Sequence, residues 1–210
     1  MDDPQKKMEN AILCGIEDEG DVFSDARLRQ LAALIAEGAD PSAMTIPLWR
    51  GGGGGNTSAL ILAAARDWGA VVSLFLLDEG LDVDAVDVDG ENAFFAALHA
   101  GHSAPARLLF ERSDMSMSDG EGRSCLLAAI GSGLADEAMM IIERMDDAER
   151  QEELKAMRER MLAGGGVIAH DLEARMAALL LSKIEQAALA GASEGASTGR
   201  RSGVGRARSL

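Results

Sequence analysis

The glycine-rich stretch at residues 50–57 is the first place where the residue types suggest chemistry. Residues 51–55 are consecutive glycines, followed by Asn56. A phosphate-binding loop of the form Gly-x-x-x-x-Gly-Lys-Thr would need glycine in place of Arg50 and lysine in place of Asn56. Because that lysine supplies the charge that holds the phosphates, the stretch does not predict nucleotide binding.

The other candidates for catalysis are a serine and three histidines. Residues 191–195 spell Gly-x-Ser-x-Gly around Ser193. A nucleophile elbow needs a strand before the serine and a helix after it, whereas here a helical pattern precedes and a Gly/Ser/Ala/Arg segment follows. His99, His102 and His170 have neither a metal-ligand nor a catalytic-triad spacing, and we expect His102 to cap a helix turn. We therefore predict a protein without enzymatic activity and without a cofactor.

An acidic run between residues 78 and 91 suggests calcium binding. With Gly90 as the sixth position of an EF-hand loop, the first and twelfth positions fall on Ala85 and Ala96, where carboxylates are required. A solvated hairpin explains the run better, and a weak divalent-ion site is the alternative. The residues concerned are Asp82, Asp84, Asp87 and Asp89.

These acids belong to a unit that occurs twice in succession. Each landmark of the unit recurs after 32 residues: Asp87 and Asp119, Gly90 and Gly122, Ala97 and Ala129, Gly101 and Gly133. A period in this range, with turn residues ahead of two short apolar segments, is the signature of stacked repeats. Alanines at the recurring central position predict tight packing of one repeat on the next.

The repeat resembles the ankyrin family, whose pattern ends its two helices with Gly-His and Gly-Ala-Asp. Gly101-His102 matches the first of these motifs, and residues 38–40 match the second. The family's Thr-Pro-Leu-His element is degraded here to residues 92–95 and 124–127, and Trp68-Gly69 lies where Gly-His is expected. The resemblance implies an all-α fold, an ankyrin-type α-solenoid of stacked helix–turn–helix repeats joined by hairpin loops.

The repeats and their flanking segments divide the chain into three parts. The ankyrin-like domain spans residues 1–145, with units at about 4–43, 55–85, 87–118 and 119–145, and a mobile insertion loop at 44–54. A helical hairpin at 146–190 forms a C-terminal cap, and an Arg/Gly/Ser tail at 191–210 is expected to be disordered.

Helix boundaries are predicted from apolar spacing and capping residues. We expect helices at 4–18, from Ser24 or Asp25 to Gly38, at 58–67, 70–78, 146–162 and 171–189. The first two resemble a capping repeat with a polar outer face.

Charge, cysteine spacing and the N-terminal residues predict where the protein is found and what it can bind. The net charge is −15, and Asp and Glu exceed Lys and Arg most strongly in residues 1–145, so the repeats should repel nucleic acid. Cys14 and Cys125 lack metal-type spacing and are read as free thiols of a reducing compartment. The N-terminal residues are acidic rather than basic, which does not fit a secretory signal. We expect an intracellular, cytoplasmic monomer without a membrane span.

The leading hypothesis for function is a protein-binding module: an adaptor, inhibitor or targeting subunit. In the ankyrin family, hairpin tips and inner first-helix positions contact the partner, and acids there would favour a basic one. By that resemblance the contact residues are Trp49, Arg50, Arg66, Asp67, Asp84, Val86, Asp87, Asp89, His99, Met117, Asp119 and Glu121. Trp49 could instead fold back on its own repeat.

Two other functions compete with this one. The hairpin at 146–189 could mediate self-association, which would make the protein structural. The arginines of the tail could contact nucleic acid or an anionic surface; they are Arg200, Arg201, Arg206 and Arg208.

Overall fold

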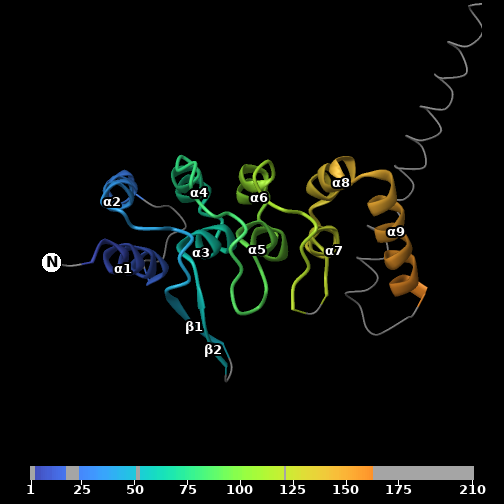
Figure 1. Cartoon of the computed structure of the whole chain (residues 1–210), viewed down its shortest axis with the longest axis horizontal. Coiled ribbons are helices and arrows are strands. Elements are labelled where there is room, and N and C mark those ends of the chain that lie inside the picture. Colours follow the sequence, from blue (N-terminus) through green and yellow to red (C-terminus); the bar gives the residue numbers. More distant parts are fainter. Residues whose placement is uncertain (1–2, 18–23, 51–52, 121, 163–210) are drawn as a thin grey trace, which may run out of the picture. The chain divides into compact units, whose positions relative to one another are not determined.

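The structure is a computed structural model that describes residues 3–17, 24–50, 53–120 and 122–162 (Figure 1). The chain divides into two compact units, Met1–Asp146 and Asp147–Leu210. The described part is mostly helical, as the sequence predicts, with one small sheet of two strands.

The elements of the described residues follow one another as helices with a single hairpin between the second and third. The helices are α1 (Pro4–Glu17), α2 (Asp25–Ala36), α3 (Ala59–Ala65), α4 (Gly69–Phe75), α5 (Ala93–Ala100), α6 (Ser103–Leu109), α7 (Cys125–Gly131), α8 (Ala135–Arg144) and α9 (Asp147–Leu162). The strands are β1 (Ile46–Arg50) and β2 (Gly53–Thr57).

Helices α1 to α8 form four pairs within the first unit. Each odd-numbered helix packs against the even-numbered helix that follows it. The odd-numbered helices also contact one another in succession, and so do the even-numbered ones, so that two rows of helices lie side by side (Figure 1). Ala97 and Ala129, the recurring alanines, are completely buried where α5 and α7 pack in this row.

Helices α3, α5 and α7 begin at matched capping residues. Ser58, Asn92 and Ser124 have extended backbones, and each side chain accepts a hydrogen bond from the N–H three residues later. Such caps satisfy one of the free N–H groups at a helix start. Ser24 caps α2 in the same way, as the sequence predicts.

The turns inside the pairs α3–α4, α5–α6 and α7–α8 each contain a left-handed residue, and this corrects one alignment made from the sequence. Gly101 and Gly133 have φ of 79° and 77°, and Asp67 holds the same place with φ of 58°. After each of them a backbone N–H bonds the carbonyl five residues back, as in Trp68 N to Ala63 O at 3.0 Å. Asp67-Trp68, and not Trp68-Gly69, is therefore equivalent to Gly101-His102.

The segment predicted as a mobile insertion loop, residues 44–54, contributes instead to an antiparallel hairpin. The register pairs Ile46 with Thr57 and Arg50 with Gly53. Ile46 and Thr57 are buried, which ties the base of the hairpin to the repeats. At Gly55, an added Cβ would lie 2.2 Å from a methyl carbon of Val88. The absence of a side chain at Gly55 therefore lets the hairpin approach the following loop closely.

The charged helix predicted at 146–162 is present as α9. The second helix of the predicted C-terminal hairpin and the arginine tail lie outside the described residues. Among the helices that the structure describes, none combines the length and apolar character needed to cross a membrane.

Candidate partner-binding surface

Two loops carry most of the predicted contact residues that the structure describes. The first loop, residues 76–92, joins α4 to α5, and the second loop, residues 110–124, joins α6 to α7. Both loops and the β1–β2 hairpin extend in the same direction from the row of odd-numbered helices (Figure 1). The tips of the first and second loops touch each other, because the N–H of Gly120 donates to the carbonyl of Asp89 at 2.9 Å.

Asp87 and Asp119 shape the tips of these loops. The Oδ1 of Asp87 accepts the N–H groups of Asp89 at 2.9 Å and Glu91 at 3.2 Å. The Oδ1 of Asp119 accepts the N–H of Arg123 at 2.7 Å, and its Oδ2 accepts the Arg123 Nε–H at 2.7 Å. Side chains of this kind close turns by replacing backbone acceptors. Both aspartates thus act in loop structure, which their prediction as contact residues did not foresee.

Asp84 also has two structural partners, both in the repeat that follows it. Its Oδ1 accepts the side-chain N–H of Asn92 at 3.1 Å and the backbone N–H of Asp114 at 2.8 Å. Because Asn92 caps α5 and Asp114 lies in the second loop, Asp84 joins the first loop to the next repeat. Asn92 also donates to the sulfur of Met117, which is half-buried.

Arg112 and Arg144, near the loops, donate hydrogen bonds to backbone carbonyls. The guanidinium of Arg112 donates to four backbone carbonyls at the end of α4, those of Leu76, Asp78, Glu79 and Leu81. Arg144, 32 residues later, donates to the carbonyl of Phe110 and lies 5.4 Å from the centre of its ring. Cations at helix C-termini satisfy free carbonyls and oppose the helix dipole.

The outward surface of the first loop is therefore acidic and aliphatic. Leu77, Val86 and Val88 have 77%, 44% and 61% of their surface exposed. No Lys or Arg lies between residues 76 and 92. The exposed acids of this loop are Asp78, Glu79, Asp82 and Asp89.

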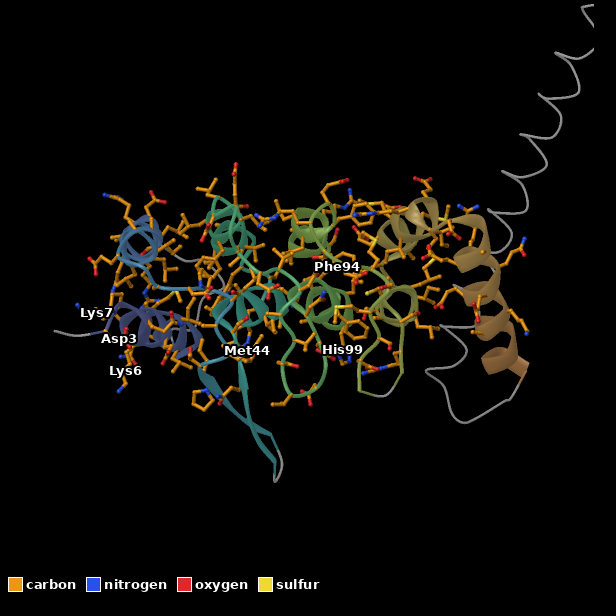
Figure 2. The ribbon with its side chains drawn as sticks, viewed as in Figure 1. Asp3, Lys6, Lys7, Met44, Phe94 and His99 are labelled. Carbon is orange, nitrogen blue, oxygen red and sulfur yellow. The ribbon has the colours of Figure 1, made fainter. Side chains whose placement is uncertain are left out.

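His99 lies at the end of α5, on the side from which the loops extend (Figure 2). Its Nδ1 is 2.7 Å from Glu91 Oε1, and its Nε2 is 3.4 Å from Arg123 Nη1. Arg123 in turn pairs with Asp119. The structure thus connects His99 to both loops. One signal for this is present in the sequence, since Glu91 and Arg123 stand 32 residues apart.

The other predicted contact residues belong to the end of α3, to β1 and to the second loop. Arg66 and Asp67 are exposed at the end of α3. Trp49 and Arg50 belong to β1, but their side chains lie outside the described part, as does Glu121. Val88, Glu91 and Arg123 were missed by the sequence analysis.

The described residues do not contain a group of three or more His, Cys, Asp or Glu side chains arranged to hold a metal ion. In the acidic run, Asp84 and Asp87 accept the hydrogen bonds described above, and Asp82 accepts the N–H of Asp84 at 3.2 Å. His102 is the N-cap residue of α6, but its side chain makes no capping hydrogen bond, in contrast to the prediction.

No protein-family model matches the chain, and no curated protein matches its sequence.

Proposed function

We propose that residues 1–145 form an ankyrin-type α-solenoid that binds another protein and catalyses no reaction. Three properties support this arrangement: the paired helices in two rows, the spacing of 34 and 32 residues between the equivalent turns at Asp67, Gly101 and Gly133, and loops that extend to one side. Stacked repeats of this kind offer extended binding surfaces.

The observation that carries the proposal is the surface of the first loop. Val86 and Val88 are exposed close together in the first loop, whose other side chains include many carboxylates. Clustered apolar side chains with a polar rim are typical of interaction sites. Because the nearby arginines are engaged with backbone and with Asp119, the surface charge favours a partner with basic and aliphatic side chains.

The test compares variants in affinity capture from a native lysate, followed by binding measurements with the purified partner. The loop variant carries Val86→Ser and Val88→Ser. The control carries Leu108→Ser, which removes an aliphatic side chain that is 40% exposed on α6, away from the loops. We expect the loop variant to bind at least about tenfold more weakly, chiefly through faster dissociation. Equal binding by the parent, the loop variant and the control would exclude the first loop as the site.

A further inference from the structure

The four residues Glu91, His99, Arg123 and Asp119 form a continuous polar chain across two repeats. Glu91 and Arg123 hold the same position in successive repeats, directly before the caps of α5 and α7. His99 lies between them, 42% exposed, whereas the side chains of Glu91 and Asp119 are 12% and 3% exposed. The chain therefore joins the bases of the two loops through a single imidazole.

The geometry suits a neutral imidazole with its hydrogen on Nδ1. In that tautomer Nδ1–H donates to Glu91 and Nε2 accepts from Arg123, so that both contacts are satisfied. A proton added at Nε2 would place an N–H opposite the N–H of a guanidinium, 3.4 Å away. Glu91 would then hold His99 more strongly, while Arg123 would lose an acceptor and meet a like charge.

Other charged groups around α5 are few. Helices α3 and α7, which pack against it, consist of apolar and small residues without charge. Arg107 of α6 pairs with Asp136 and Glu137 instead. Arg66 and Asp67 follow α3 as exposed residues of opposite charge. Two neutral contacts complete the surroundings: the ring of Phe95, and Ser132, whose hydroxyl donates to the His99 carbonyl at 2.9 Å.

We propose that His99 is a proton-controlled tie between the two loops: neutral, it holds the second loop to α5 through Arg123, and protonated, it releases that side chain. Protonation at Nε2 removes the acceptor that holds Arg123, so it would loosen the second loop against the first. The consequence for partner binding rests on the proposed function above, whereas the tie itself is a property of the free chain.

The experiment uses the full chain without a partner, so that its failure is distinct from a failure of the proposed function. The Gly120 N–H, which bonds Asp89 across the loop tips, reports on their contact. Its hydrogen-exchange protection, corrected for the intrinsic pH dependence, is measured at about pH 8 and about pH 5.5. We expect protection to fall about two- to fivefold at the lower pH, the range of an exposed ion pair. In the His99→Gln variant, the corrected protection of the Gly120 N–H should be the same at both pH values.

His102→Gln is the matched control, since His102 lies at the neighbouring turn between α5 and α6; it should respond as the parent does. Circular dichroism checks that all variants are folded. Nitrogen NMR of the imidazole provides a second readout and should show Nδ1 protonated at the higher pH. The opposite tautomer, an unchanged Gly120 protection in the parent, or an equal loss in His99→Gln would each overturn the proposal.

Discussion

Ala97 and Ala129 are buried completely at equivalent places in α5 and α7. Ala129→Leu should lower the free energy of unfolding by about 1–3 kcal/mol, because extra methyl groups in a packed interior force their neighbours to move. Urea unfolding followed by circular dichroism measures the change. Ala100→Leu, at an exposed position of α5, is the control and should have little effect. Equal stability of Ala129→Leu and the parent would contradict the packing.

Asp67 has the positive φ that glycine supplies in the next two repeats. A left-handed backbone costs a residue with a Cβ about 1–2 kcal/mol, and aspartate tolerates it better than a branched residue. Asp67→Gly should therefore leave the stability unchanged or raise it slightly. Asp67→Val should lower the free energy of unfolding by about 1–2 kcal/mol. Thermal and urea unfolding of the pair test this, and a valine variant as stable as the glycine variant would exclude the assigned turn.

At the scale of elements, polar groups join neighbouring helix pairs on the side of the even-numbered helices. Glu137 of α8 is buried and accepts hydrogen bonds from Ser103 Oγ at 2.5 Å and Arg107 Nε at 2.6 Å. Burial raises the pKa of its carboxyl, but the hydrogen bonds from Ser103 and Arg107, a backbone hydrogen bond and the charge of Arg107 together lower it by more, so the pKa lies below the ordinary value. A carboxyl with a lowered pKa stabilises the folded state most when it is ionised.

The stability that Glu137 contributes depends on pH. The contribution of Glu137 is fully present above the pKa of the unfolded chain and is lost as the pH falls toward the lower pKa of the folded state. Compared with the parent, Glu137→Gln should be less stable at neutral pH, by about 1–3 kcal/mol for a charged hydrogen bond. The difference should shrink below about pH 5. Urea unfolding across this range measures it; a difference that is constant with pH would refute the role of the charge.

Arg112 stabilises the end of α4 by donating to carbonyls of residues 76–81. Arg112→Met keeps the aliphatic length but removes all of these donors. We expect a loss of about 1–3 kcal/mol of unfolding free energy, because partly buried carbonyls lose their partners. Arg66→Met, at an exposed position, provides the control for loss of one positive charge. If both variants unfold at the same urea concentration, the contacts of Arg112 contribute nothing beyond its charge.

Local signals explain which elements could be predicted from the sequence. Ser24 and the start of α9 were predicted because a cap or a charged helical pattern is read from adjacent residues. The β1–β2 hairpin was not, since glycines offer no side-chain alternation and the pairing depends on burial of Ile46. The role of Asp84 depends on a bond to Asp114, 30 residues away, which no local pattern contains.

At the scale of the whole molecule, the net charge of −15 should act on the rate at which a basic partner arrives. Asp84, Asp87 and Asp89 contribute to this field on the first loop. The bonds of Asp84 and Asp87 described above use Oδ1, and an asparagine keeps an oxygen that can accept them. Replacing all three residues with Asn therefore removes charge while it preserves acceptors for these bonds.

We expect the triple Asn variant to associate with the captured partner severalfold more slowly at low salt, with a smaller change in the dissociation rate. The difference should vanish at high salt, where exposed charges are screened beyond a few ångströms. A matched variant with the same net charge carries Glu9→Gln, Asp25→Asn and Glu37→Gln, on or beside α1 and α2. Stopped-flow association at several salt concentrations compares the two. Equal slowing in both would show that total charge, and not the first loop, steers the partner, whereas slowing in the loop variant alone would assign the approach to the acidic tip.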